Sequence, residues 1–176
     1  MNTLDTILQS VRAILQTTPA RWLNLTESVA ADFLVQPPAP GEWSAVECLQ
    51  HLVDTERWVF PARVRFLLAG QDFPAFDPDS QGTKPAVDQS PASLAVEFAR
   101  LRAEGLQALA EVVPADLPRQ ARHQELGTVS MDELLHEWAA HDLMHTVQAE
   151  RALMQPFIQG CGPWQHYFQD HVARSG

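Results

Sequence analysis

The sequence is poor in lysine and cysteine, and each shortage excludes a type of chemistry. Of its 12 basic residues, only Lys84 is a lysine, and it lies in a stretch rich in proline and glycine. Nothing there would desolvate the amine, so Schiff-base chemistry is not expected. Cys48 and Cys161 are too few for a disulfide framework or a thiolate zinc cluster. Cys48 falls within a helical pattern and is expected to be a small core residue.

Signals for export and membrane insertion are also missing. The N-terminus has neither a basic segment nor an apolar run, so we expect no signal peptide and a cytoplasmic location. No stretch approaches the length of a membrane span, so no membrane insertion is expected. The net charge is −10, which argues against nucleic acid and against an anionic membrane surface as the main partner.

What the sequence does contain is amphipathic helices. Apolar residues recur at helical spacing in four long segments, and no segment shows a convincing strand pattern. Residues 119–129 are expected to be irregular, and residues 71–89 to form a long loop. We therefore predict an all-α protein, with one four-helix bundle domain over residues 1–176 and a short C-terminal helix from Trp164 to Val172.

Capping residues and prolines mark where these helices begin and bend. Ser44 with Glu47, and Ser130 with Glu133, are capping boxes that should start the second and fourth helices. Pro61 should kink the second helix and release a carbonyl about one turn earlier. The remaining expected limits are a first helix from Leu4 that is kinked or continued at Pro19, an end of the second helix at Gly70, a third helix from Ser90-Pro91 to Val112, and an end of the fourth near Gln155.

Two histidines four residues apart occupy the middle of the fourth predicted helix. His141 and His145 fall on one face and in line with the core stripe, so both should point inward. Such a pair can bind one metal ion; otherwise it is a buried polar liability. His51 lies on an inward stripe of the second helix and can supply a third ligand. Spacing alone also allows surface or hydrogen-bonded histidines, and leaves the relative direction of the two helices open.

Acidic residues near these histidines are candidates for orienting them. Asp54, three residues after His51, can hold its imidazole or simply solvate the helix. Glu137, one turn before His141, can accept a hydrogen bond from a ligand, although we favour a solvent-facing position.

Two further polar residues of the fourth helix, Gln148 and Asp142, are also candidates for contacts that support the histidines, and each has another interpretation. Gln148, one turn after His145, can bind a metal-bound water or a substrate, or fill the bundle. Asp142 occupies the place that glutamate holds in HExxH proteases, but aspartate is shorter and no other protease signature is present, so no protease is predicted.

The other histidines and most tryptophans are expected to be structural. Ordinary polar roles are predicted for His123, His136, His166 and His171. Core packing rather than a stacking platform is predicted for Trp43, Trp58, Trp138 and Trp164.

Three segments of the sequence resemble the DinB/YfiT-like superfamily. The first is Gly41-Glu42-Trp43-Ser44 through Cys48-Leu49-Gln50-His51-Leu52 to Asp54-Thr55-Glu56. The second runs from Leu134 to His145, with Gln148 after it, and the third is Gly162-Pro163-Trp164. Together they extend the resemblance over nearly the whole chain.

The resemblance implies a bundle of unusual up-down-down-up topology, in which the second and fourth helices are antiparallel. It also implies that three histidines bind one divalent metal ion, and that homodimers are frequent. Matched onto this sequence, the ligands are His51, His141 and His145. Zinc or nickel is preferred, while iron, manganese or cobalt would also suit a three-histidine site.

A three-histidine site predicts an open metal, because a structural zinc site has four protein ligands. The resemblance implies transferases that use low-molecular-weight thiols such as bacillithiol, mycothiol or glutathione, and isomerases of maleylpyruvate-type substrates. The metal would hold such a cosubstrate as thiolate, and Arg57 or Arg63 could meet its carboxylates. A metal-dependent hydrolase and a non-catalytic, stress-associated metal-binding dimer are the alternatives.

Overall fold

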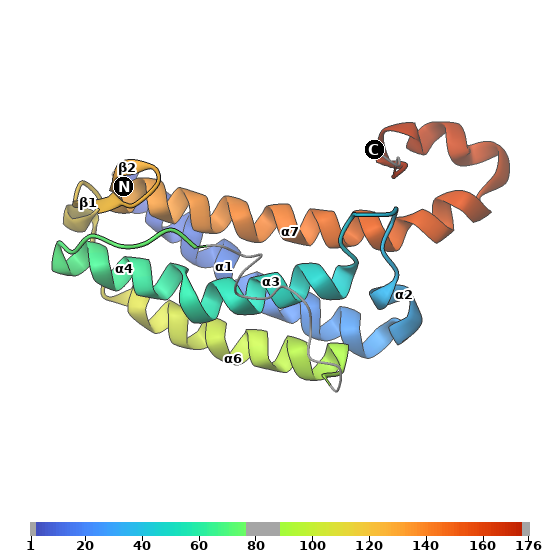
Figure 1. The fold of residues 1–176 in the computed structure, drawn as a ribbon, viewed down its shortest axis with the longest axis horizontal. Helices are drawn as coiled ribbons and strands as arrows, with labels where there is room; N and C mark the ends of the chain where they lie inside the picture. Colours follow the sequence, from blue (N-terminus) through green and yellow to red (C-terminus); the bar gives the residue numbers. More distant parts are fainter. Residues whose placement is uncertain (1–2, 77–88, 174–176) are drawn as a thin grey trace.

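The structure is a computed structural model that describes residues 3–76 and 89–173. Four helical units lie side by side as a bundle (Figure 1). They are α1 (Thr3–Ser28), α3 (Ala45–Trp58) continued by α4 (Phe60–Ala69), α6 (Pro91–Ala110) and α7 (Met131–Gly160). A short helix, α2 (Ala31–Val35), precedes α3, and a 3-10 helix, η2 (Gly162–His171), follows α7. The prediction of an all-α four-helix bundle is confirmed.

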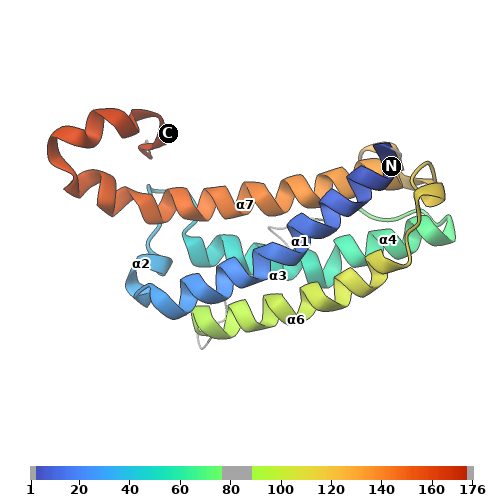
Figure 2. The ribbon, with the colours of Figure 1, turned by 180° about the vertical axis from the view of Figure 1, so that it is seen from behind.

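The helices follow the up-down-down-up order. In Figures 1 and 2, α1 and α7 run in one direction, whereas α3–α4 and α6 run in the other. Both α1 and α3 pack against α6 and against α7. The two helices that carry the histidines, α3 and α7, are therefore antiparallel neighbours.

Both predicted capping boxes are present at the starts of these two helices. The hydroxyl of Ser44 accepts from the Glu47 amide, and the Glu47 carboxylate accepts from the Ser44 amide at 2.7 Å. Ser130 and Glu133 make the same pair of bonds at the start of α7. Each box satisfies two backbone donors that the first helical turn would leave unpaired.

Proline acts differently at two helical positions. α1 continues through Pro19 without interruption. Before Pro61 the chain leaves the helical conformation at Val59, whose φ is −112° and ψ −79°, so that α3 and α4 are separate helices. Pro61 has no N–H to donate to the carbonyl one turn earlier, at Arg57, and this explains why the predicted kink is a break.

The prediction that residues 119–129 are irregular was wrong. A 3-10 turn, η1 (Pro114–Asp116), leads into an antiparallel hairpin of β1 (Gln120–His123) and β2 (Gly127–Ser130). Gly127 supplies a positive φ of 81° directly after the turn. Each strand has four residues, too short for a clear alternating pattern, and a bridge between His123 and Phe73 ties the hairpin to the chain after α4.

The C-terminal elements also differ from the sequence-based limits. α7 continues past Gln155 to Gly160, with Pro156 inside its last turns. The segment after it is a 3-10 helix that starts at Gly162 rather than Trp164. For the long loop predicted at 71–89, residues 77–88, which include Lys84, lie outside the described residues.

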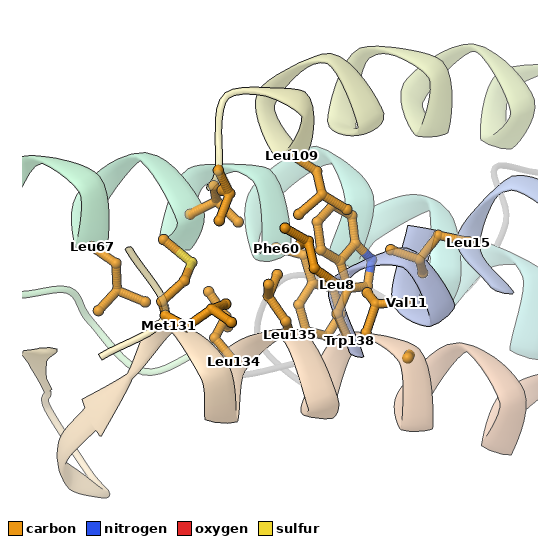
Figure 3. Close-up of a cluster of buried hydrophobic side chains, with 14 of the residues drawn as sticks. Leu8, Val11, Leu15, Phe60, Leu67, Leu109, Met131, Leu134, Leu135 and Trp138 are labelled. Carbon is orange, nitrogen blue, oxygen red and sulfur yellow. The ribbon is translucent and has the colours of Figure 1, made fainter. Parts of the chain in front are cut away.

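The hydrophobic core consists of two clusters. The cluster in Figure 3 joins α1, α4, α6 and α7 through Leu8, Val11, Leu15, Phe60, Leu67, Leu109, Met131, Leu134, Leu135 and Trp138. The second surrounds Trp22, Leu49 and Phe98. Along α7, the last residue of the first cluster is Ala139, and the first residue of the second cluster is Ala149. The buried residues of α7 between these two positions are Asp142 and His145, so a polar layer separates the clusters.

Within residues 3–76 and 89–173, no helix combines the length and the hydropathy that a membrane span requires.

Candidate metal centre

The antiparallel packing of α3 and α7 brings three histidines together. One ring nitrogen from each of His51, His141 and His145 lies within 4.8 Å of the others. The Nε2 atoms of His51 and His141 are 3.0 Å apart. His51 and His145 are buried, and His141 is partly buried. The inward orientation predicted for all three side chains is thus confirmed. His51 and His141 are 90 residues apart in the sequence and meet only in the folded bundle.

Burial keeps these imidazoles neutral at physiological pH. Together with a smaller effect of the neighbouring histidines, it lowers the pKa of His51 to about 4 and that of His141 to about 3. The pKa of His145 is also lowered by burial. A neutral imidazole has one nitrogen with a free lone pair, which is the form that binds a metal.

Gln148 fixes the orientation of one ring. Its Oε1 lies 2.9 Å from Nδ1 of His145, so Nδ1–H is the donor and Nε2 is left with its lone pair. A hydrogen bond of this kind is typical of metal-binding histidines. This contact agrees with the supporting role for which Gln148 was a candidate.

The donor set fits a divalent transition metal. Three neutral imidazoles converge, and in the described part of the chain the Nδ1 atoms of His51 and His141 are buried without a hydrogen-bond partner. Two Nε2 atoms 3.0 Å apart leave room for one hydrogen between them. Without a ligand the cluster therefore leaves buried ring nitrogens incompletely paired, which is costly.

Aromatic rings surround the three histidines. Trp43 stacks on His145 with ring centroids 5.6 Å apart, and lies 5.1 Å from His51. Phe60 meets His141 edge-on at 5.1 Å. The prediction that the tryptophans are core residues holds for Trp138, which is fully buried. It was wrong for Trp58 and Trp164, which are 59% and 64% exposed because they lie on outer faces, while Trp43 covers the site.

A cavity of about 230 Å³ opens beside the histidines. Its walls come from α3, α4, α7, the hairpin and the segment after α4, and include His51, Thr55, Val59, Phe60, Arg63, Phe76, His123, Glu125, Leu126, Glu137 and His141. The α3–α4 break at Val59 lies within this wall. A small molecule in the cavity would contact two of the three histidines directly.

Asp54 does not orient His51. Its carboxylate accepts two hydrogen bonds from Gln50 at 3.0 Å and one from Arg57 at 3.3 Å. Arg57 also forms an ion pair with Glu97 of α6. The alternative, in which Asp54 solvates the helix, was also wrong, because its side chain is only 7% exposed.

Asp142 also points away from the histidines. It is completely buried and accepts from Arg102 at 2.5 Å and from Thr18. Arg102 in turn pairs with Glu56 at 2.8 Å, and the Trp138 indole donates to the same Glu56 oxygen. Asp142 therefore belongs to a charged network among α1, α3, α6 and α7, which the sequence did not reveal.

Glu137 and His123 occupy the cavity wall. Glu137 is half exposed, as favoured from the sequence, and its carboxylate lies 3.7 Å from Arg63. His123 was expected to be an ordinary polar residue, but it is buried and lies 3.0 Å from Arg63 Nη2. It was missed because it sits in a short strand, without the helical spacing that identified the other histidines.

Comparison with known proteins identifies the class. A model of the DinB superfamily matches residues 14–149, so the chain belongs to this superfamily. Among solved structures, one described as "YfiT from Bacillus subtilis is a probable metal-dependent hydrolase with an unusual four-helix bundle topology" is similar in fold, with a TM-score of 0.70 and 17% identity over 89% of this chain and 90% of that one. No curated protein matches the chain.

Proposed function

We propose that this protein is a metal-dependent enzyme for small molecules, with one divalent metal ion bound by His51, His141 and His145. The observation that carries the proposal is the convergence of three neutral imidazoles beside a cavity. When bound, the metal would supply positive charge that activates a thiol or polarises a substrate oxygen. The absence of a fourth protein ligand in the described cluster agrees with an open rather than a closed structural site.

The side chains around the site prepare it for a small substrate. Trp43 and Phe60 keep two of the imidazoles in apolar surroundings, and Gln148 holds His145 in one tautomer. The cavity wall combines the apolar rings of Phe60 and Phe76 with the guanidinium of Arg63. Apolar walls with a few placed polar groups are typical of small-molecule sites.

The reaction class that we favour is transfer of a low-molecular-weight thiol to an electrophile. The S–H bond of the thiol breaks and the sulfur bonds to the electrophilic carbon of an activated double bond or an epoxide. The π bond or the C–O bond at that carbon breaks, and the proton ends on the neighbouring carbon or oxygen. Neither cysteine lines the cavity. Cys48 is buried in the core, where burial raises its pKa to about 12, and Cys161 directly follows the end of α7. A separate thiol cosubstrate is therefore required.

A metal-dependent hydrolase is the second candidate. The specific observation in its favour is the fold shared with YfiT, which is described as a probable metal-dependent hydrolase. In this case the metal and the cavity would act on water and an ester or amide rather than on a thiol.

Two measurements test the proposal. Elemental analysis of purified protein, reconstituted with zinc or nickel, should give about one metal per chain, and His51→Ala should lose it. Conjugation of an electrophile should then be followed with glutathione, bacillithiol and mycothiol, and ester hydrolysis in parallel, for wild type and His51→Ala. Metal binding without any rate above that of the variant would support the non-catalytic alternative.

We also propose that the chain forms a homodimer, as the resemblance implied. In support, the end of α7 and the segment after it expose large apolar side chains, including Phe157, Trp164 and Tyr167. Light scattering coupled to gel filtration should give twice the chain mass of 19.6 kDa. A single-chain mass at micromolar concentration would contradict this.

A further inference from the structure

Arg63 is a buried cation whose charge is poorly compensated. Its side chain is 10% exposed, and burial lowers its pKa. The carboxylate of Glu137 is 3.7 Å away, beyond hydrogen-bond distance, and is itself 49% exposed. A buried guanidinium normally has close, hydrogen-bonded anions, as Arg102 has in this protein. Arg63 therefore has capacity for a further anion.

The contact between Arg63 and His123 contains a conflict between donors. The backbone amides of Glu125 and Leu126 both point at Nδ1 of His123, at 3.1 and 3.2 Å. A neutral imidazole whose Nδ1 accepts must carry its hydrogen on Nε2. That Nε2 faces Arg63 Nη2 at 3.0 Å, and a guanidinium can only donate. Two donors thus face each other, and an anionic oxygen accepting from both would resolve the conflict.

The neighbours of Arg63 hold it in place at the cavity. Its guanidinium lies over the ring of Phe73, 5.5 Å from the centroid. Phe73 is buried and is fixed by backbone hydrogen bonds to Arg122 and Gln124, on either side of His123. Arg63, His123 and Glu137 line both the cavity beside the metal centre and an adjoining one of about 360 Å³. A planar, rigid fork of N–H donors is the geometry that binds a carboxylate through both oxygens.

We propose that Arg63 and His123 bind the carboxylate of a small anionic substrate, in the cavity that His51 and His141 also line. This inference rests on the proposed function, because it assigns the substrate class of the same site. Of the two arginines considered from the sequence, Arg57 is engaged by Asp54 and Glu97, whereas Arg63 lines the cavity. The substrate is therefore a carboxylic acid whose apolar part contacts the rings of Phe60 and Phe76.

Benzoate and its neutral isostere benzamide are suitable probes. Their affinities are measured by titration calorimetry on the full chain, both after chelator treatment and after reconstitution with zinc. Wild-type protein should bind benzoate about tenfold or more tightly than benzamide, since charge-assisted hydrogen bonds to Arg63 stabilise only the anion. Arg63→Met should remove this preference, and Arg57→Met, the matched control, should retain it.

Glu137→Gln provides a test that does not alter a buried residue. This substitution removes the one carboxylate that competes with benzoate for Arg63 among the described residues, so benzoate should bind about two- to fivefold more tightly. Equal binding of benzoate and benzamide, unchanged benzoate affinity in Glu137→Gln, or benzoate binding that requires zinc and persists in Arg63→Met would each overturn the inference. The chelated sample separates the two proposals, because the anion site does not need a metal whereas the proposed function does.

Discussion

Two buried polar clusters lie within one helical turn of each other on α7. One consists of paired charges, and the other of neutral imidazole rings. Asp142 joins a network of full charges, in which Arg102 sits between two carboxylates and each partner is at most 1% exposed. The adjacent His141, with His145, belongs to a group of neutral rings that keep free nitrogens. The charges of the Arg102 network pair with one another, whereas the histidine cluster offers ring nitrogens to a ligand.

The difference separates a structural role from a binding role. The charged network connects α1, α3, α6 and α7 through buried ion pairs, and none of Glu56, Arg102 and Asp142 lines the cavity beside the histidines. The histidine cluster contacts a cavity and makes few hydrogen bonds within the described structure. Substitutions in the first cluster should therefore change stability, and those in the second should change metal binding.

The largest effect is expected from Arg102→Met. This change leaves the carboxylates of Glu56 and Asp142 buried without their cation, which should lower the free energy of unfolding by about 3–5 kcal/mol. Urea unfolding followed by circular dichroism measures the loss. Arg100→Met is the matched control, because Arg100 pairs with Glu104 on the surface of the same helix, and such a pair contributes about 0–1 kcal/mol. Equal losses for both variants would contradict a structural role for the network.

His141→Ala should affect metal binding rather than stability, unlike Arg102→Met. It should abolish metal binding while changing the unfolding free energy of the chelated protein by about 1 kcal/mol, since a neutral, incompletely paired ring is removed. Elemental analysis and urea unfolding of the same sample give both values. His136→Ala is the control on α7, because His136 is exposed and hydrogen-bonded to its own helix. If His141→Ala unfolds the protein as Arg102→Met does, the two clusters do not have separate roles.

The histidine cluster should also make the metal-free protein sensitive to acid. In the unfolded chain His51 and His141 bind protons below about pH 6.5, whereas in the folded protein their pKa values are about 4 and 3. The unfolded state then holds more protons, so stability should fall as the pH drops from 6.5 to 4, by about 1 kcal/mol per pH unit for each of the two histidines. Chelated wild type should show this slope in urea unfolding. Chelated His51→Phe should show a shallower one, and an unchanged slope would assign the acid sensitivity to other groups.

Much of the bundle was predictable because its signals are local. The capping residues Ser44 and Ser130 lie within four residues of the helix starts that they specify, and Pro61 acts on the preceding turn. The inward direction of the three histidines followed from helical periodicity in the same way. The four-residue strands of the hairpin were missed, because they are held by pairing and by the bridge to Phe73 rather than by a pattern of their own.

The partners of the polar side chains were the least predictable part. Asp142 and Thr18 are 124 residues apart, and Arg102 and Asp142 are 40 apart. Which of these meet depends on the order of helices in the bundle. For this reason Asp54 and Asp142 were considered as partners of histidines from their sequence positions, although both point to arginines. Gln148, a candidate of the same kind, does contact a histidine, because the two lie one turn apart on the same helix.

The smallest expected effect concerns Gln148. Among the described residues outside the cluster, it is the one whose side chain is hydrogen-bonded to a histidine of the cluster. Gln148→Leu removes the acceptor at similar volume, so the metal affinity should fall about tenfold or more. Gln148→Glu keeps an acceptor for Nδ1–H of His145 and should retain the affinity. Competition with a chromogenic zinc chelator measures both, and stability without metal should be nearly equal in the two variants. If the Gln148→Leu and Gln148→Glu variants bind zinc with equal affinity, Gln148 only fills the bundle. The orientation of His145 then comes from its stacking on Trp43.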